Sequence, residues 1–379
     1  MKEASPANAV HTTKLKDTKG IILHGGKGTR LRPLTHTGPK QLIPIANKPV
    51  SQYVLEDLVS AGITDIAIVL GSINPERVTE HFGDGSRFQA KITYVYQGEP
   101  KGIAHAVGLC EQFARDSPFV VYLGDNMIKN GISRYVQDFV QGNYDAAFLL
   151  ARVDDPRQYG VVVFGEDKNI IDVEEKPEKP KSNYVLTGVY FFSASIFDII
   201  RMLRPSKRNE LEITDAIKTL IKSGGYRIKY YYVDGWWDDT GSAEDILEAN
   251  RYILDNDLKS EIKGVVEEGA TIIGRIFTDE NTIIKRGTVI RGPVHIGKSC
   301  EIGPNAYIGP YTAIGNRCII RGASIEFSII LDNTRIECTT RIVDSLIGQD
   351  SEVLTREGSL PNGNRLIIGE SSKVSFSNM

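Results

Sequence analysis

The chain has 379 residues, 41% hydrophobic and 25% charged, which suits a globular protein with two domains. Its net charge of −3 at pH 7 argues against a nucleic-acid partner, which would normally require a basic domain or stripe. No apolar run approaches the length of a membrane span, so we expect no membrane partner. Residues 1–18 lack the apolar segment of a signal peptide and are expected to form a mobile tail. Four cysteines without metal-ligand spacing point to a reduced, cytoplasmic protein.

A glycine-rich segment follows the first predicted strand. The apolar run 21–23 is typical of a buried strand, and backbone N–H groups in a glycine turn suit a phosphate. The segment contains Gly25, Gly26, Gly28, Thr29, Arg30 and, in a Pro-Lys-Gln sequence, Lys40. It is not a P-loop, and the third glycine position of a dinucleotide fingerprint holds Leu31. The combination of glycines, Gly-Thr-Arg and a Pro-Lys step therefore indicates another kind of phosphate site.

This combination resembles the opening motif of the sugar-1-phosphate nucleotidylyltransferases, Gly-Gly-x-Gly-Thr-Arg-Leu-x-Pro-Leu-Thr followed by Pro-Lys-x-Leu-x-Pro. Within that family the chain is most similar to the long-form glucose-1-phosphate thymidylyltransferases, which carry a C-terminal left-handed β-helix. The resemblance extends over nearly the whole chain after residue 18. It departs from the family at His24, where Ala is usual.

The first predicted domain, residues 19–257, alternates apolar runs with helical patterns. Strands are predicted at 65–70, 92–96 and 119–123, and helices at 51–61, 75–82, 103–113 and about 242–256. This alternation predicts βαβ units, a parallel sheet and ligands beyond the carboxyl ends of its strands. Closer strands at 145–151, 160–164, 170–174, 185–192 and 226–233 indicate a mixed sheet. The pattern predicts an α/β, Rossmann-like mixed sheet, and the resemblance implies that it is a nucleotidyltransferase fold of the GT-A-like kind.

The resemblance implies a nucleotide site. Its residues would be Gly25, Gly26, Gly28, Thr29, Gln97, Gly102 and Asp125. Gln97 would hydrogen-bond the Watson–Crick edge of a pyrimidine, and Gly102 would leave room for that base. A carboxamide can satisfy both a carbonyl and an imide N–H, but thymine and uracil differ by one methyl, worth only about 1 kcal/mol.

Two carboxylates are candidates for a Mg²⁺ site. The strand 119–123 runs into Gly124-Asp125-Asn126, and Asp239 lies in Trp-Trp-Asp-Asp-Thr-Gly. Mg²⁺ commonly takes one or two protein carboxylates and completes its shell with water and substrate phosphates. Both residues match the family's metal motifs. Asp238 is the rival in register, and the family's Trp-Leu-Asp-Thr-Gly fits best with Asp239 as ligand.

Further segments resemble the family's sugar-phosphate side. They contribute Tyr159, Gly160, Glu175, Lys176, Gly188 and Arg208. By resemblance, Gly160 donates its N–H, Glu175 takes sugar hydroxyls, Lys176 takes the 1-phosphate and Arg208 contacts phosphate. Asn209 replaces the family's usual Gly after that arginine. Taken alone, Glu175 and Lys176 could equally form an exposed ion pair of little energetic value.

The second predicted domain, residues 258–379, repeats with a period of six. One frame holds Val266, Ile272, Thr278, Ile284, Ile290, Ile296, Ile302, Ile308, Ile314 and Ile320, with mostly small residues four positions later. This pattern predicts a left-handed parallel β-helix with three hexads in each coil. The frame slips at Glu326, which implies an insertion at one corner. Cys300 and Cys318 should stack one coil apart, as buried free thiols rather than a disulfide.

Many hexapeptide-repeat domains are acyltransferases, often trimeric, and generally need a catalytic histidine. The only histidine of this domain is His295, which precedes inward Ile296 and should lie on the outer face. The pattern therefore favours a structural or oligomerising solenoid. A homo-oligomer, trimer or tetramer, is expected.

The resemblance implies transfer of a nucleotidyl group from dTTP to glucose 1-phosphate, giving dTDP-glucose and pyrophosphate with Mg²⁺. Arg30 would hold the leaving pyrophosphate, Lys40 the α-phosphate, and Lys176 with Arg208 the sugar phosphate. UTP as nucleotide and N-acetylglucosamine 1-phosphate as sugar are alternatives. From other classes, an acyltransferase would depend on His295, and a silent nucleotide-sugar sensor would be expected to lack Arg30, Lys40, Asp125 or Asp239, all of which are present.

Overall fold

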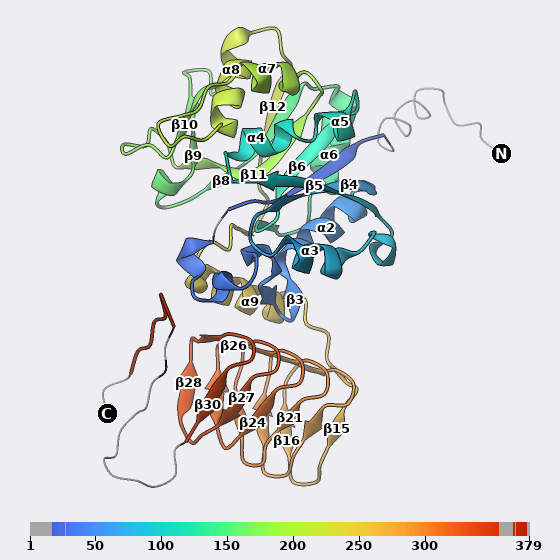
Figure 1. Ribbon diagram of the computed structural model, residues 1–379, viewed down its shortest axis with the longest axis vertical. Helices are drawn as coiled ribbons and strands as arrows, with labels where there is room; N and C mark the ends of the chain where they lie inside the picture. Colours follow the sequence, from blue (N-terminus) through green and yellow to red (C-terminus); the bar gives the residue numbers. More distant parts are fainter. Residues whose placement is uncertain (1–16, 27, 356–366, 368, 377–379) are drawn as a thin grey trace, which may run out of the picture. The chain divides into compact units, whose positions relative to one another are not determined.

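The computed structural model describes residues 17–26, 28–355, 367 and 369–376 (Figure 1). Residues 1–16 of the predicted tail lie outside these ranges. The chain divides into two compact units. Unit 1 is Met1–Lys27, Thr37–Leu42 and Val50–Asp239, and unit 2 is Gly28–His36, Ile43–Pro49 and Thr240–Met379. In the described part of the chain, no helix is long and apolar enough to cross a bilayer.

Unit 1 is built on a nine-stranded mixed sheet, as the sequence predicted. Seven strands follow the order β10-β9-β11-β6-β1-β4-β5, and β8 joins β11 to β12. The strands are β1 (Lys19–His24), β4 (Asp65–Gly71), β5 (Lys91–Gly98), β6 (Phe119–Leu123), β8 (Ala146–Arg152), β9 (Gly160–Phe164), β10 (Ile170–Glu175), β11 (Tyr184–Phe192) and β12 (Ile228–Tyr232). The strands β6, β1, β4 and β5 are parallel, whereas β11 runs antiparallel to β6. The carboxyl ends of β1, β5 and β6 therefore lie at one edge of the sheet.

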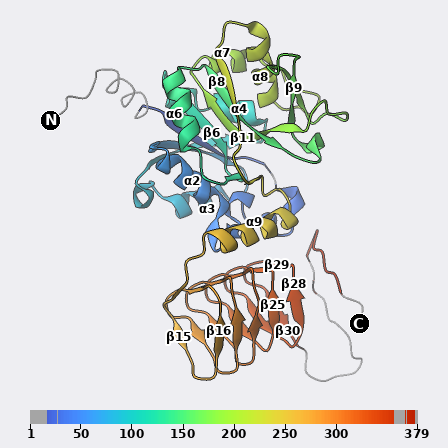
Figure 2. The same cartoon turned by 180° about the vertical axis from the view of Figure 1, so that it is seen from behind.

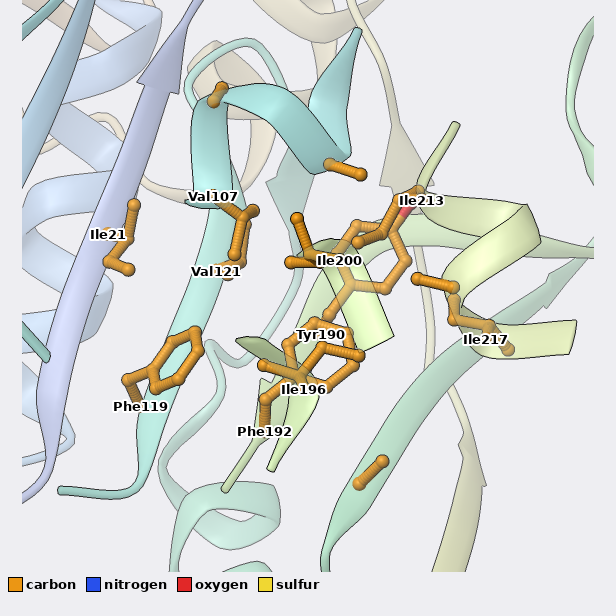
Figure 3. Packing of buried hydrophobic residues seen from close by; sticks show 14 of the residues in the cluster. Ile21, Val107, Phe119, Val121, Tyr190, Phe192, Ile196, Ile200, Ile213 and Ile217 are labelled. Carbon is orange, nitrogen blue, oxygen red and sulfur yellow. The ribbon is translucent and has the colours of Figure 1, made fainter. Parts of the chain in front are cut away.

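Helices pack on both faces of this sheet (Figures 1 and 2). They are α2 (Val50–Ser60), α3 (Pro75–Phe82), α4 (Ile103–Gly108), α5 (Glu111–Ala114), α6 (Ser133–Gly142), α7 (Ile196–Met202) and α8 (Ile213–Ser223). Along β6, Phe119 and Val121 enter one core while Val120 and Tyr122 enter the other, as the two-residue period of a strand requires. Figure 3 shows the first core, where α4, α7 and α8 cover β6 and β11. The single helix predicted at 103–113 is divided, because Cys110 leaves the helical conformation between α4 and α5.

Unit 2 contains a parallel β-helix, confirming the prediction from the hexads. Its first sheet stacks β14 (Glu261–Ile262), β17 (Ile276–Thr278), β20 (Val294–Ile296), β23 (Thr312–Ile314), β26 (Ile329–Ile330) and β29 (Leu346–Ile347). The second stacks β15 (Val265–Val266), β18 (Ile283–Ile284), β21 (Glu301–Ile302), β24 (Ile319–Arg321), β27 (Arg335–Glu337) and β30 (Glu352–Leu354). The third stacks β16 (Thr271–Ile273), β19 (Val289–Arg291), β22 (Tyr307–Ile308), β25 (Ser324–Glu326) and β28 (Arg341–Val343).

The predicted insertion near Glu326 is wrong, because the coils become shorter there. Early coils repeat every 18 residues, as in the pairing of Ile276 with Val294. Ile308 then pairs with Ile325, a spacing of 17, and Ile314 with Ile330, a spacing of 16. Single residues are therefore lost at corners, and Ile325 takes the inward position that a strict hexad count assigns to Glu326.

The cysteines behave as small buried hydrophobes. All four are free and buried. Cys300 and Cys318 lie inside the β-helix, where their thiols donate to the carbonyls of Gly315 (3.0 Å) and Leu331 (3.2 Å). In unit 1, burial raises the pKa of Cys110 to about 12. The prediction of buried free thiols is confirmed.

Within unit 2, α9 (Ala243–Asn256) covers part of the outer face of the first β-helix sheet. Ala313 and Ile329 point away from the coil interior, yet they are 0% and 1% exposed. The fully buried Asn250 of α9 accepts from the Ala46 N–H (2.9 Å) and donates to the Tyr311 carbonyl (3.0 Å). Two bonds from one carboxamide thus join α9, the strand pair β2 (Pro44–Ile45) and β3 (Lys48–Pro49), and the β-helix.

His295 lies on the same outer sheet face, between Phe277 and Ala313 of the neighbouring strands. Its ring meets that of Phe277 edge-on, with centroids 4.7 Å apart. Burial lowers the pKa of His295 to about 4, and the nearby Asp279 carboxylate opposes this shift only in part. The outward direction predicted for this histidine is confirmed, and the packing is that of a neutral structural side chain.

This packing predicts an acid-sensitive contribution to stability. Since the folded-state pKa of His295 lies below the ordinary value of 6.5, the unfolded chain binds the proton more readily below that pH. The free energy of unfolding should fall by about 2 kcal/mol between pH 7 and pH 5 through this group alone. Urea unfolding of wild type and His295→Leu at both pH values measures the difference. Equal pH slopes for the two proteins would contradict it.

Candidate active site

The candidate site in unit 1 begins where β1 and β6 end side by side. The Gly124 N–H donates to the Leu23 carbonyl (2.9 Å), which ties the segment after β6 to the end of β1. The Gln41 side chain donates to the Gly25 carbonyl (3.0 Å). A side chain at position 124 would lie 2.9 Å from the His24 ring and 3.2 Å from Gln41, so the glycine allows this close approach.

The structure brings two predicted residues, Lys40 and Asp125, into one ion pair. Lys40 lies in a 3₁₀ turn (Lys40–Leu42), and both side chains are largely buried, 16% and 11% exposed. The Asn126 amide donates to the Asp125 carboxylate (3.2 Å). A cation and a carboxylate are therefore held at the carboxyl end of a central strand, where little water screens them.

Trp237 connects this pair to the rest of the site. Its indole N–H lies within hydrogen-bonding distance of the Asn126 side chain (2.9 Å) and the Thr187 carbonyl (3.1 Å). Its ring packs edge-on against Tyr159, with centroids 5.6 Å apart. The short strands β13 (Trp237–Asp238) and β7 (Met127–Ile128) pair antiparallel, with Asp238 opposite Met127. Asp239 directly follows Asp238 in the chain, and Asn126 directly precedes Met127.

Gly188 lies in the middle of β11, close to the end of β6. Its φ of +78° belongs to the left-handed region, and a Cβ there would meet Leu123 at 2.7 Å and Asn126 at 3.2 Å. Only glycine fits this conformation and this spacing. The predicted sugar-side residue Gly188 therefore lies beside the Asp125–Asn126 turn.

Gln97 is at the end of β5, with its side-chain oxygen facing Gly25. A Cβ at Gly25 would lie 3.2 Å from the Gln97 Oε1 atom. The Gln97 amide nitrogen donates to the Gly102 carbonyl (3.2 Å) and to Nδ1 of His105 (3.2 Å). The two candidate nucleotide segments, the Gly25 turn and the Gln97–Gly102 loop, are thus neighbours in unit 1.

Gly102 precedes α4 and packs against the backbone of Leu211. Its φ is +99°, and a Cβ would overlap the Leu211 carbonyl oxygen and lie 2.7 Å from the Leu211 nitrogen. Backbone bonds join Leu211 to Lys101 (2.8 Å) and to Ala104 (3.0 Å). The space that a side chain would need at Gly102 is therefore filled by the neighbouring main chain.

Gly102→Ala is expected to destabilise unit 1 by roughly 3 kcal/mol or more, because it combines backbone strain with overlap against main chain. Gly98→Ala is the matched control, since Gly98 has a φ of +68° but no atom of the described residues within 4 Å of its Cβ position. That change should cost only about 1–2 kcal/mol. Thermal unfolding of both variants gives the comparison, and equal losses would mean that the Leu211 contact is unimportant.

On the sugar-phosphate side, Glu175 ends β10 directly opposite Gly160 of β9. The Glu175 carboxylate accepts from Thr214 (3.1 Å) and from Arg208 (3.0 Å). The exposed Lys176 follows, with its N–H donating to the Tyr159 carbonyl (2.9 Å). Four predicted residues, Tyr159, Gly160, Glu175 and Lys176, are therefore brought together.

Arg208 lies in a different setting from the one implied by the resemblance. Its guanidinium pairs with Glu175 (3.0 Å), Glu210 (3.0 Å) and Glu212 (3.6 Å). Burial raises the pKa of Glu212, although a hydrogen bond from Ser206 and the charge of Arg208 act in the opposite sense. Three carboxylates thus surround the arginine, which a phosphate would have to displace at least in part.

Among the described residues, His24 is an unpaired buried histidine beside this site. It is 3% exposed, and neither ring nitrogen has a hydrogen-bond partner in the part of the chain that the structure describes. Burial lowers its pKa to about 3, with Asp125 opposing and His81 reinforcing the shift. The ring therefore remains neutral beneath the glycine turn.

The remaining predicted residues, Gly28, Thr29 and Arg30, belong to unit 2. Gly28 adopts the left-handed conformation and precedes a short 3₁₀ turn (Thr29–Leu31). Its carbonyl accepts from the Thr35 hydroxyl (2.7 Å). The Arg30 guanidinium lies against Gly241, where a Cβ would approach its Nη2 atom to 2.7 Å.

Sequence reasoning missed four polar side chains that position the site. They are Gln41, Asn126, Thr214 and Trp237. Gln41 donates to the Gly25 carbonyl, and Asn126 donates to the Asp125 carboxylate. Thr214 donates to the Glu175 carboxylate, and Trp237 donates to the Asn126 side chain. Each lies within or next to a motif segment used in the prediction. Their proximity in the sequence was the available signal, but their partners depend on tertiary contacts.

Two protein-family models match parts of this chain. The nucleotidyl transferase family matches residues 19–256, and the GMPPB C-terminal domain matches residues 290–375. The low-salt glycan biosynthesis nucleotidyltransferase Agl11 of Haloferax volcanii is 45% identical over 94% of this chain and 99% of its own length. A glucose-1-phosphate thymidylyltransferase of Streptomyces antibioticus is 43% identical over 94% and 99%.

Among solved structures, a Bacillus anthracis protein described as a glucose-1-phosphate thymidylyltransferase matches with a TM-score of 0.59 and 39% identity. The match covers 64% of this chain and 97% of that one. The family match spans more than half of the chain, and the relatives match over nearly their whole length. This chain therefore belongs to the nucleotidyl transferase family of enzymes.

Proposed function

We propose that the enzyme transfers the thymidylyl group of dTTP to glucose 1-phosphate, giving dTDP-glucose and pyrophosphate. The observation that carries the proposal is the placement of Lys40, Asp125 and Gln97 at the carboxyl edge of one sheet. A cation, a carboxylate and a base-reading amide are the groups that a nucleotide triphosphate needs. The Streptomyces relative's name supports thymidylyl transfer to this sugar phosphate.

The chemistry is a displacement at phosphorus. An oxygen of glucose 1-phosphate forms a bond to the α-phosphorus of dTTP, the bond from that phosphorus to the α–β bridging oxygen breaks, and pyrophosphate leaves with the electron pair. The attacking phosphate is already anionic at neutral pH, so the reaction needs no general base. Catalysis rests on positioning and on neutralisation of charge.

Each proposed role is the one that the family resemblance implies, and each is compatible with the chemistry of the side chain. Lys40 holds the α-phosphate, and Arg30 with the glycine segment holds the leaving pyrophosphate. Lys176 and Arg208 hold the sugar phosphate, and Glu175 takes sugar hydroxyls. In the free enzyme Lys40 is paired with Asp125 and Arg208 with three glutamates, so substrate binding exchanges these ion pairs for phosphate contacts.

Asp125 and Asp239 are the proposed ligands of Mg²⁺. Two carboxylates fit a hard cation that keeps several waters and binds substrate phosphates, and the amide of Asn126 orients the first of them. When bound, the ion supplies neutralisation of phosphate charge. Lys40 shares the Asp125 carboxylate, so the lysine and the ion are expected to act on the same phosphate groups.

UTP is the main alternative nucleotide, because Gln97 reads an edge that thymine and uracil share. The extra methyl changes the binding free energy by only about 1 kcal/mol unless a pocket encloses it. N-acetylglucosamine 1-phosphate is the alternative sugar. The acyltransferase hypothesis gains no support, because His295 packs as a structural side chain against Phe277.

The buried free thiols support the predicted cytoplasmic location. The flat sheet faces of the β-helix support the predicted homo-oligomer, a trimer or tetramer.

The proposal is tested by pyrophosphate release with Mg²⁺ and glucose 1-phosphate, comparing dTTP, UTP, CTP, ATP and GTP. The expected result is the highest kcat/KM with dTTP. A higher value with UTP would establish the uridylyl alternative. No release with any nucleotide, across several hexose 1-phosphates, would contradict the proposed activity.

A further inference from the structure

The Gln97 side-chain amide has a definite orientation, and its nitrogen and its oxygen differ in whether they are free to bind a nucleobase. Its nitrogen lies 3.2 Å from the Gly102 carbonyl and 3.2 Å from Nδ1 of His105. A carboxamide nitrogen only donates, and it has two protons for these two partners. Both protons are therefore committed within the protein, whereas Oε1 faces Gly25.

His105 can accept this hydrogen bond from Gln97 only with Nδ1 unprotonated, because a protonated Nδ1 would itself be a donor. Partial burial, and then the positive charge of Lys101, lower the pKa of His105 below its ordinary value. The neutral ring therefore accepts at Nδ1 and carries its proton on Nε2. His105 belongs to α4, whose neighbouring residues Ala104 and Ala106 are buried, so the helix is anchored on its other side.

This arrangement has a consequence for the nucleobase. With both N–H groups engaged, Gln97 can offer an incoming base only its oxygen, which is an acceptor. Thymine and uracil present a donor there, the imide N3–H, whereas cytosine presents a lone pair at N3. A flipped amide would reverse this preference and favour cytosine.

We propose that His105 is a positioning residue that fixes the orientation of the Gln97 carboxamide and thereby selects pyrimidines with an N3–H against cytosine. The inference rests on the proposed function, because it assumes that Gln97 reads the base. A second residue, His105, then contributes to the selectivity for the base. His105 itself does not touch the nucleotide in this account.

The test compares dUTP with dCTP, which differ only at N3 and at the group on C4. His105→Leu removes the acceptor at similar size, and His105→Asn keeps an acceptor close to the position of Nδ1. Steady-state pyrophosphate release with glucose 1-phosphate gives kcat/KM for each nucleotide, and the KM for glucose 1-phosphate serves as an internal control for the rest of the site.

In His105→Leu, kcat/KM for dUTP should fall about 3- to 10-fold, the value of one hydrogen bond, while that for dCTP stays equal or rises. The fall should appear in the KM for the nucleotide and not in the KM for glucose 1-phosphate. His105→Asn should keep the selectivity of the wild type within about threefold, because it restores the acceptor.

Two results would overturn the inference. One is a wild-type ratio of dUTP to dCTP in His105→Leu. The other is an equal loss for both nucleotides, in His105→Leu and His105→Asn alike, which would show a merely structural role. A wild-type enzyme inactive with every pyrimidine triphosphate would instead overturn the proposed function and this inference together, so the two failures are distinguishable.

Discussion

Replacing Lys40 by Ala is expected to lower kcat by about 10²–10³, because the lysine stabilises charge that develops at the α-phosphate. The side chain is only 16% exposed, so water cannot replace it efficiently. The loss should appear in kcat and kcat/KM alike, as expected for an interaction made chiefly in the transition state. Steady-state pyrophosphate release with the preferred nucleotide measures both constants.

Lys222→Ala is the matched control for this experiment. Lys222 is 55% exposed and pairs with Asp172, a carboxylate outside the proposed site. Its removal should leave kcat unchanged, and circular dichroism should show both variants folded. A folded Lys40→Ala enzyme with near-normal kcat would remove Lys40 from the mechanism.

Replacing Asp125 by Asn should lower kcat to a similar degree, about 10²–10³, although the side chain keeps its size. The change removes a proposed Mg²⁺ ligand and also leaves Lys40 without its partner. The concentration of Mg²⁺ that gives half-maximal activity should therefore rise. Asp167→Asn is the control, because Asp167 is an exposed residue that contacts Asn169 in a surface turn.

The shared ion pair makes a second, sharper prediction for these two residues. If Lys40 and Asp125 act as a unit, the double variant Lys40→Ala with Asp125→Asn should lose little more than either single variant. Full multiplication of the two losses would show that the residues act independently. That result would contradict the proposal that Lys40 and the ion held by Asp125 act on the same phosphate groups.

The β-helix was predictable from the sequence because every coil needs aliphatic side chains at the same inward positions. An aliphatic residue such as Ile290 or Ile302 returns to the interior at fixed spacing, and the structure places both there. The corner near Glu326 was not predictable in the same way. Losing one residue breaks the six-residue period just as an insertion would. Only the pairing of Ile308 with Ile325 in the structure distinguishes the deletion from an insertion.

In the candidate site, likewise, positions set by the local sequence were predictable, whereas contacts made by the tertiary fold were not. Gly25 and Asp125 lie just after strands and Gln97 lies at the end of one, so their place at one sheet edge could be inferred from strand order. The partners of Arg208 could not, because its pairing with Glu175 depends on how β10 packs near the segment before α8. The sequence also could not predict that the buried His24 nitrogens have no hydrogen-bond partner among the described residues, since burial depends on the whole fold.

The measurement that tests the central claim most directly follows the oxygen atoms of the sugar phosphate. Glucose 1-phosphate labelled with oxygen-18 in its terminal phosphate oxygens is incubated with dTTP, Mg²⁺ and enzyme, and the products are analysed by mass spectrometry. Attack on the α-phosphorus predicts dTDP-glucose that retains all of the label, together with unlabelled pyrophosphate. Label in the pyrophosphate, or no nucleotide sugar at all, would contradict the account.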